Sequence, residues 1–262
     1  MHPELLRIGS FALPTYGVLL ASGFLAALWL LRRRAPAYGV PPDSAADVAI
    51  WLLLAGLVGA KLLLLVVEGP RYLTSWDGFV EFLRSGGVFY GGLLGAVVAL
   101  AVMLRKKSIG FWTFVDMAAP SVALGHAIGR LGCLSAGCCW GRDCRLPWAI
   151  TFTDPAAERN VGVPLNVPLH PTQIYEAAGL FVLCGLLVAL GRPRFKGQIF
   201  ATYLGLYGLL RGTIEFFRGD PRGAVLGGAV STSQLIALGG ILAALAIWGL
   251  NRKRAPVEGA VA

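Results

Sequence analysis

The position of the basic residues constrains the fold of this chain more than any other feature of its sequence. Twelve of the 23 Lys and Arg residues form four clusters, and each cluster adjoins a long apolar run. Loops on the cytoplasmic side of a membrane retain Lys and Arg because these charges resist translocation. Each cluster therefore predicts the inner end of a membrane span. The clusters are Arg32 to Arg34, Arg105 to Lys107, Arg192 to Lys196 and Arg252 to Arg254.

Four inner clusters predict about seven transmembrane helices, with the N-terminus outside and the C-terminus cytoplasmic. Each apolar run is close to the ~20 residues that a helix needs to cross ~30 Å of hydrocarbon. The fold class is therefore an all-α polytopic integral membrane protein. The predicted spans are residues 13–31, 46–67, 88–104, 111–134, 172–191, 198–217 and 231–250.

The composition leaves little room for a soluble domain. Hydrophobic residues make up 56% of the chain and charged residues 14%, which predicts a single membrane-embedded domain over residues 1–262. The net charge of +9 is explained by topology and by an anionic ligand, so we expect no nucleic-acid partner. Basic residues follow the first apolar run instead of preceding it, which argues against a cleaved signal peptide.

Two segments between the spans differ from the rest in composition. Residues 68–87 are rich in charged side chains, and residues 135–171 hold several prolines and most of the cysteines. We expect both to be outer-face elements beside a site. The sequence contains no pair of matching broken helices, which argues against a carrier built from inverted repeats.

The sixth span carries a polar stripe. Tyr203, Tyr207, Arg211, Glu215 and Arg218 follow one another at spacings of four, four, four and three, so they share one helical face. Charges at membrane depth usually face a protein interior or a water-filled cavity. An ion ladder that only neutralises itself is the structural alternative. The excess of Arg over Glu favours an anionic ligand instead.

The fourth span contains a second polar pair. His126 and Arg130 are one turn apart, and Gly125, Gly129 and Gly132 provide the small surfaces that let membrane helices approach closely. Glycines are ordinary in such packing, but an arginine is not. A lone histidine is more often a hydrogen-bonded packing residue than a catalytic one, so His126 is left outside the predicted site.

Two helix entries add candidate ligand-binding groups. Residues 85–92 form a Gly-rich entry whose backbone N–H groups could face a phosphate, although such entries are common in membrane proteins. Residues 170–176 open the fifth span. Helix capping explains Pro171 and Thr172, but it does not require the polar residues around them, which are His170, Gln173, Tyr175 and Glu176.

These segments together resemble the prolipoprotein diacylglyceryl transferase family, and the resemblance covers nearly the whole chain. Its most specific parts are the fourth-span and fifth-span motifs taken together. The matching stretches are 14–17, 59–61, 86–92, 129–132, 140–142, 170–176 and 207–218 with Asp220.

The resemblance implies a function. The enzyme would transfer the sn-1,2-diacylglyceryl group of phosphatidylglycerol to the lipobox cysteine thiol of a preprolipoprotein, forming a thioether and releasing glycerol 1-phosphate. It would be a multi-pass protein of the bacterial inner membrane with its active site toward the outer face. We expect no cofactor and no metal. Its partners would be phosphatidylglycerol, the lipobox segment and membrane lipids.

The resemblance also assigns roles to residues. The family's arginine that contacts phosphatidylglycerol falls on Arg130, and its essential sixth-span arginine falls on Arg211, with Glu215 placed to orient a guanidinium. Fixed positive charge suits a phosphodiester leaving group in a low-dielectric site. The predicted catalytic residues are Arg130, Arg211 and Tyr90, and the predicted substrate-binding residues are Tyr16, Arg130, Gly141, His170, Gln173, Tyr175, Glu176, Tyr207, Glu215 and Arg218.

Three departures from the family pattern bear on the chemistry. Tyr90 replaces the usual histidine, a proposed base, and Lys61 stands where arginine is common. Cys133, Ala136 and Cys138 replace two asparagines and a glutamate. A phenol titrates near 10 and is a poor base at neutral pH. We therefore expect Tyr90 to orient the headgroup by hydrogen bonding, while an arginine-rich field favours the thiolate of the acceptor.

The cysteines allow three interpretations. Cys133, Cys138, Cys139 and Cys144 cluster at the outer end of the fourth span, and Cys184 is a small apolar residue of the fifth. One or two disulfides in an oxidising outer compartment are the preferred prediction. Their spacing fits a zinc site poorly. A catalytic thiol that carries the diacylglyceryl group would need a depressed pKa.

The departures also leave two other functions open. A paralogue of the same fold would use a different acceptor. A lipid-binding or lipid-translocating protein would release no glycerol phosphate.

Overall fold

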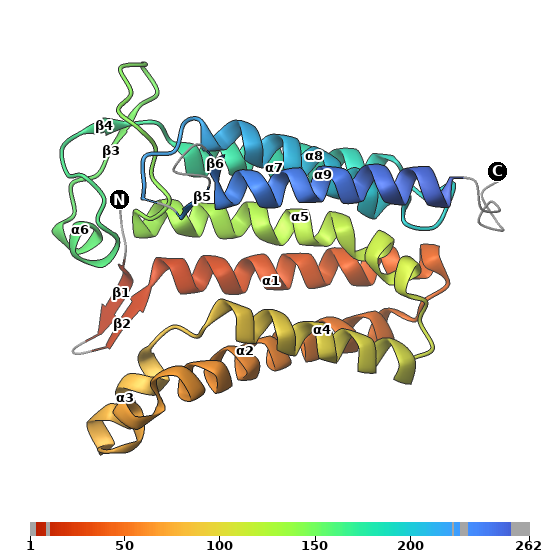
Figure 1. The fold of residues 1–262 in the computed structure, drawn as a ribbon, viewed down its shortest axis with the longest axis horizontal. Helices are drawn as coiled ribbons and strands as arrows, with labels where there is room; N and C mark the ends of the chain where they lie inside the picture. Colours follow the sequence, from red (N-terminus) through yellow and green to blue (C-terminus); the bar gives the residue numbers. More distant parts are fainter. Residues whose placement is uncertain (1–3, 9–10, 222, 226–229, 253–262) are drawn as a thin grey trace. The chain divides into compact units, whose positions relative to one another are not determined.

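The computed structural model describes residues 4–8, 11–221, 223–225 and 230–252 of the chain (Figure 1). Lys253 and Arg254 of the last basic cluster lie outside the described residues. The chain divides into two compact units. We call Met1–Leu31 with Val115–Ala262 the larger unit and Arg32–Phe114 the smaller unit, and each is described by itself.

The smaller unit is built on a pair of closely packed helices. α2 (Pro42–Leu73) packs along α4 (Phe89–Lys106), and the turn η1 (Ala35–Tyr38) precedes them. A Cβ added at Gly59 would lie 2.4 Å from the carbonyl oxygen of Gly91, and one at Gly95 would lie 2.3 Å from that of Ala55. Small residues thus let the two backbones approach. Gly91, in the Gly-rich entry, has a packing role in the structure.

The amphipathic helix α3 (Trp76–Arg84) connects α2 and α4, and Lys61 fixes its end. The Lys61 ammonium group donates to the carbonyl oxygens of Phe82 at 2.5 Å and Ser85 at 2.7 Å. Ser75 caps the start of α3, because its side chain accepts from the backbone N–H of Gly78 at 3.0 Å. Most of the charged segment 68–87 is therefore helical, and Lys61 holds backbone carbonyls within this unit.

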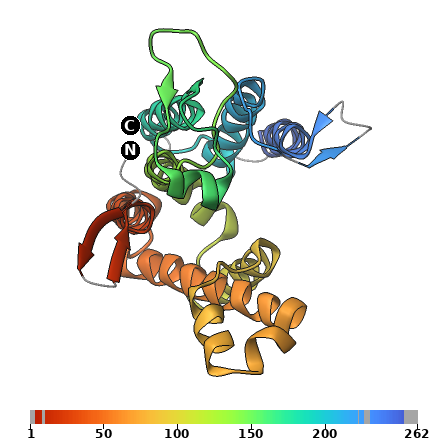
Figure 2. The same ribbon diagram turned by 90° about the vertical axis from the view of Figure 1, so that its left-hand side faces the viewer.

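The described residues of the larger unit include five long helices. Figures 1 and 2 show α5, α7, α8 and α9 running along one direction, with α8 between α7 and α9. The hydrophobic core of this unit consists mainly of Ala, Leu and Ile side chains from α1, α5, α7 and α8, such as Leu30, Ala123, Leu180 and Ile199. The bounds are α1 Thr15–Arg34, α5 Phe111–Ala136, α7 Thr172–Ala189, α8 Gln198–Glu215 and α9 Thr232–Asn251.

A buried carboxylate of α5 sets the position of α8. Asp116 is 1% exposed, and its two oxygens accept from the backbone N–H groups of Gly197 at 2.7 Å and Phe200 at 2.9 Å. The first N–H groups of a helix have no partner within it, and a negative charge there is favourable. The Asp116 carboxylate provides both the hydrogen-bond acceptors and the negative charge. It therefore fixes the start of α8, the helix that carries most of the polar stripe.

The segment between α5 and α7 folds as a small layer of its own. It contains β3 (Ile150–Thr151), α6 (Pro155–Val161) and β4 (Pro168–Leu169), and β3 pairs with β4 in antiparallel fashion. Phe152, Val163 and Leu169 are each at most 1% exposed in its core. Two other antiparallel pairs complete the described sheets, β1 (Glu4–Ile8) with β2 (Phe11–Pro14) and β5 (Ala224–Val225) with β6 (Val230–Ser231).

All seven predicted spans contain a helix, namely α1, α2, α4, α5, α7, α8 and α9. Within the described residues, five helical stretches are long and apolar enough to cross a membrane, the exceptions being α5 and α8. Arg32 to Arg34 fall in the last turn of α1, and Arg105 and Lys106 in that of α4. The chain is thus a largely helical, multi-pass membrane protein. Its seven crossings and the orientation of its termini stay predictions.

Candidate active site

Arg130 and Glu176 form a buried ion pair in the larger unit. Arg130 lies on α5 and Glu176 one turn into α7, and their Nη2 and Oε1 atoms are 2.9 Å apart. Glu176 is 0% exposed, and the Arg130 side chain is 13% exposed. A buried charge is strongly unfavourable unless it is paired, and this pair meets that condition for both groups. The structure thus joins two predicted site residues that the sequence places 46 positions apart.

Two further side chains complete this cluster. The hydroxyl of Tyr207 on α8 donates to Oε1 of Glu176 at 3.1 Å. Nε of Arg130 donates to Nε2 of His126 at 3.3 Å, and that nitrogen lies 3.8 Å from Oε1 of Glu176. The Tyr207 ring also contacts the ring of His126 edge-on and stacks on that of Tyr203. Three helices therefore orient one guanidinium.

His126 and Tyr203 belong to this cluster, although the sequence analysis left both outside the site. His126 was excluded because a lone histidine is usually a packing residue. The available signal was its position one turn before Arg130 on the same helical face. Tyr203 was recognised as part of the polar stripe, and its spacing from Tyr207 was the signal that placed it here.

Arg211 and Glu215 form a second ion pair one turn apart on α8. Their Nη2 and Oε2 atoms are 2.6 Å apart, and both side chains are 8% exposed. Nη1 of Arg211 has no hydrogen-bond partner within the described part of the chain. A buried N–H donor without a partner is uncommon, so this guanidinium has capacity for a further acceptor.

A cavity of about 300 Å³ lies beside Arg211, between α8 and α9. Tyr203, Tyr207 and Arg211 line it from α8, and Ser233, Ile236 and Gly240 line it from α9. Tyr207 connects the two parts of the site, because it lines the cavity and also binds Glu176. The space is mainly apolar with one cationic wall, which suits an anionic group attached to an apolar chain.

Arg218 lies beyond the end of α8, which corrects its predicted place on the helical stripe. α8 ends at Glu215, and Arg218 makes two hydrogen bonds with the Asp220 carboxylate, at 2.7 and 2.6 Å. The chain turns after Glu215 and brings the carbonyl oxygen of Arg218 within 3.1 Å of Nε of Arg142. Arg218 therefore joins the segment around residue 141 instead of extending the Arg211–Glu215 pair.

Gly141 occupies a position where no larger residue fits. A Cβ added there would lie 2.4 Å from the carbonyl oxygen of His170 and 2.9 Å from that of Phe217. The backbone of Arg142 bonds to both neighbours, donating to Phe217 at 2.8 Å and accepting from His170 at 2.9 Å. Gly141 thus lets three segments meet beside the start of α7.

The remaining residues of the 170–176 run have separate roles. The hydroxyl of Tyr175 accepts from Nε1 of Trp148 at 2.7 Å and lies 3.2 Å from Nδ1 of His170. Gln173 is 1% exposed, and its amide donates to the carbonyl oxygen of Cys138 at 2.7 Å. His170 and Tyr175 thus form one aromatic cluster, while Gln173 faces the cysteine segment.

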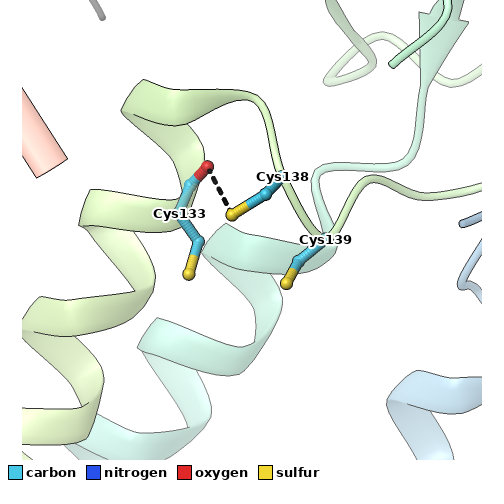
Figure 3. A group of neighbouring side chains, drawn as sticks. All are labelled: Cys133, Cys138 and Cys139. Carbon is cyan, nitrogen blue, oxygen red and sulfur yellow. Dashed lines mark hydrogen bonds between the residues drawn. The ribbon is translucent and has the colours of Figure 1, made fainter. Parts of the chain in front are cut away.

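The cysteines are all thiols in the structure, so the disulfides that were preferred from the sequence are not formed. The sulfurs of Cys133, Cys138 and Cys139 lie within 4.8 Å of one another (Figure 3). Cys144 lies apart from them, with its backbone N–H bonded to the carbonyl oxygen of Pro168. Cys184 is buried in the core of the larger unit, as expected of a small apolar residue.

Cys139 is the cysteine with the most polar surroundings. Nη1 of Arg130 lies 3.5 Å from its sulfur. Hydrogen bonds with the thiols of Cys133 and Cys138 lower the pKa of Cys139, and the positive charge of Arg218 adds to this effect. Hydrogen bonding with Cys133 and Cys139 raises the pKa of Cys138. Of the three thiols, Cys139 is the one whose sulfur lies within 3.5 Å of the Arg130 guanidinium.

Tyr90 and Tyr16, two predicted site residues, make no hydrogen bond with the Arg130–Glu176 or Arg211–Glu215 pairs in the described structure. Tyr90 belongs to the smaller unit, where it is 73% exposed and contacts the ring of Phe89 edge-on. Tyr16 belongs to the larger unit, at the start of α1 and 40% exposed. A Cβ added at Gly132 would lie 3.2 Å from its ring, so Tyr16 packs on α5 near Cys133. The predicted roles of Tyr16 and Tyr90 stay predictions.

Comparison with known proteins identifies the same family across nearly the whole chain. Residues 3–250 match the family model described as prolipoprotein diacylglyceryl transferase. Two proteins named phosphatidylglycerol–prolipoprotein diacylglyceryl transferase are similar to this chain. The one from Clostridium tetani is 35% identical over 97% of this chain and 99% of its own length. The one from Geobacter sulfurreducens is 35% identical over 90% of each.

Proposed function

Because the chain belongs to the prolipoprotein diacylglyceryl transferase family and is a transferase of lipoprotein biosynthesis, we propose the reaction it catalyses. It transfers the sn-1,2-diacylglyceryl group of phosphatidylglycerol to the lipobox cysteine of a preprolipoprotein. The names of the similar proteins supply the donor and the class of acceptor. The C–O bond between the diacylglyceryl carbon and the phosphate breaks, a C–S bond forms, the thiol proton is released, and glycerol 1-phosphate leaves.

The observation that carries this proposal is a pair of guanidinium groups in the larger unit, of which Arg211 is buried and Arg130 is largely covered. The Arg130 group is oriented by Glu176, and the Arg211 group lines the 300 Å³ cavity with an Nη1 that has no hydrogen-bond partner among the described residues. Preorganised cations in a low-dielectric site stabilise charge that develops on a leaving phosphate. Arginine suits this role because its planar fork matches phosphate oxygens. Arg130 and Arg211 are thus the proposed phosphate ligands.

The other site residues are proposed to position these two arginines and the substrates. Glu176 and Tyr207 hold the Arg130 guanidinium, and Glu215 holds that of Arg211. Gly141 permits the close approach of the segments that carry His170 and Arg218. His170, Gln173 and Tyr175 lie at the start of α7, next to those segments. We place the site toward the outer face of the bacterial inner membrane.

The proposed role of Tyr90 is to orient the headgroup by hydrogen bonding. The variant Tyr90→Phe keeps the ring and deletes the hydroxyl. We expect weaker phosphatidylglycerol binding with turnover retained at saturating lipid. Loss of turnover with lipid binding intact would instead assign the hydroxyl to the chemical step.

The experiment that tests the function is glycerol phosphate release by the purified protein. It is supplied with phosphatidylglycerol and a lipobox peptide, and the matched control is the same peptide with its cysteine changed to alanine. Release only with the cysteine peptide, together with a peptide mass increase equal to the diacylglyceryl group, is the expected result. Release with neither peptide from folded protein would refute the proposed acceptor.

A further inference from the structure

The three sulfurs beside Arg130 are a cluster that the proposed transfer reaction does not use. Cys133 lies in the last turn of α5, and Cys138 and Cys139 follow the end of that helix. Their sulfur atoms all lie within 4.8 Å of one another, and Figure 3 shows the three side chains gathered between the ends of α5 and α7. Within the described residues, this is the one group of three or more Cys, His, Asp or Glu side chains close enough to share a metal ion.

The surrounding structure fixes the backbone that presents these sulfurs. The hydroxyl of Thr172 donates to the carbonyl oxygen of Cys139 at 2.7 Å, and the amide of Gln173 donates to that of Cys138 at the same distance. Thr172 and Gln173 are at most 1% exposed. The position of Cys138 and Cys139 is therefore set by buried side chains of α7.

The backbone conformation at this turn is unusual for a cysteine. Cys139 has a φ of 63°, shortly after Gly137 at 78°. A non-glycine residue in the left-handed region is disfavoured by roughly 1–2 kcal/mol, and such residues are concentrated at functional sites. In this conformation the Cys139 sulfur lies near those of Cys133 and Cys138 (Figure 3).

We propose that Cys133, Cys138 and Cys139 bind one thiophilic metal ion, of the Zn²⁺ or Cu⁺ class, as thiolates. Soft sulfur ligands select these ions over Mg²⁺, Ca²⁺ or Mn²⁺. At a Zn–S distance of ~2.3 Å, three thiolates around one ion lie about 4 Å apart. The three sulfurs reach this arrangement by moving less than about 1 Å from separations of up to 4.8 Å.

The charge balance supports the same site. Three thiolates with one Zn²⁺ carry a net charge of −1, and with one Cu⁺ a net charge of −2. Nη1 of Arg130 lies 3.5 Å from the Cys139 sulfur, so a fixed cation adjoins the cluster and favours its ionised form. Binding releases the thiol protons, because thiolates are the ligands. The fourth position of a Zn²⁺ ion stays open to water.

This site differs from the sequence expectation of no metal, and the reason is geometric. A zinc site was disfavoured because four cysteines at spacings of five, one and five residues do not form two separated pairs. The structure separates Cys144 from the group and brings the other three together. The end of α5 and the tight turn after it place three sulfur ligands together within seven residues, whereas zinc sites usually take their ligands from two separated pairs.

The test is direct metal binding by the purified, full-length chain, reduced with a phosphine that does not compete for the metal. Cd²⁺ titration is followed by the ultraviolet charge-transfer band of Cd–thiolate bonds, and bound Zn²⁺ is measured by elemental analysis after dialysis. We expect one ion per chain. Cys139→Ser should weaken binding at least about 100-fold, since outer-shell changes alone cause losses of ~10–100-fold.

The matched control is Cys184→Ala, which removes a cysteine of the same larger unit outside the cluster. It should bind one ion with wild-type affinity. Size-exclusion chromatography and circular dichroism establish that each variant is folded. Absence of a bound ion in the reduced protein, or equal binding by Cys139→Ser and wild type, would overturn the proposal. Because the readout is metal binding, the result is independent of the proposed transfer reaction.

Discussion

The variant Glu176→Gln tests whether the buried ion pair with Arg130 holds the site together. The change keeps the shape of the side chain and removes its charge. Oε1 of Glu176 is 2.9 Å from Arg130 and 3.1 Å from the Tyr207 hydroxyl, and the carboxylate is 0% exposed. Loss of one partner from a buried pair destabilises a protein by ~3–5 kcal/mol, because the other charge stays buried.

We expect the lower end of that range, about 3 kcal/mol, since the amide oxygen of glutamine still accepts from Tyr207 and Arg130. For a chain of this size, this corresponds to a fall in Tm of roughly 6–12 °C. Tyr207→Phe is the matched control. It deletes one hydrogen bond and leaves both charges, which corresponds to about 1 kcal/mol and roughly 2–4 °C.

The assay is thermal unfolding of the purified protein in one detergent, followed by intrinsic tryptophan fluorescence. The double variant Arg130→Met with Glu176→Gln removes both charges, and it should be more stable than Glu176→Gln alone. If Glu176→Gln lowers Tm no more than Tyr207→Phe does, the pair contributes no charge-dependent stability. Glu176 would then not anchor Arg130 through its charge.

Three other variants test separate parts of the structure. Gly141→Ala places a Cβ 2.4 Å from the carbonyl oxygen of His170, and thermal unfolding should show a loss of stability of about 1–3 kcal/mol or more. Gly129→Ala is the control, because a Cβ there meets nothing within 4 Å, and it should leave the stability unchanged. Asp116→Asn keeps an acceptor oxygen for only one of the two backbone N–H donors, so amide hydrogen exchange should accelerate at the start of α8. Unchanged exchange at the start of α8 would contradict the capping role of Asp116. Arg211→Ala leaves Glu215 without its ion-pair partner and should lower stability as well as kcat, the latter about 10²–10³-fold when activity is measured below the Tm of the variant. Arg211→Lys should restore only part of kcat, since ammonium lacks the planar fork, and full activity of Arg211→Lys would show that charge alone suffices.

Local sequence patterns predicted the polar side chains on each helix but not every partner between helices. The turn spacing on α8 correctly placed Tyr207, Arg211 and Glu215 on one face, and the structure pairs Arg211 with Glu215. The same spacing wrongly extended the stripe to Arg218. The helix ends at Glu215, and the Asp220 carboxylate provides Arg218 with a partner in the following turn. The spacing of polar residues does not show at which residue a helix ends.

The sequence by itself determined the class of protein and the family. Apolar runs of about 20 residues and the basic clusters beside them follow from the membrane as a solvent, and the helices of the structure coincide with those runs. The motifs of the fourth and fifth spans identified the family that the comparisons then showed. These properties depend on residues that are close together in the chain.

Only the tertiary structure decided which groups meet across helices. The sequence shows Glu176 only as one of several polar residues in its run. In the structure its carboxylate lies 2.9 Å from Arg130, on a neighbouring helix. The sequence favoured disulfides for the cysteines after the fourth span. In the structure Cys133, Cys138 and Cys139 are thiols, grouped at a turn in which Cys139 has a positive φ. Such contacts depend on crossing geometry and on close approach at residues such as Gly141, which sequence spacing does not encode.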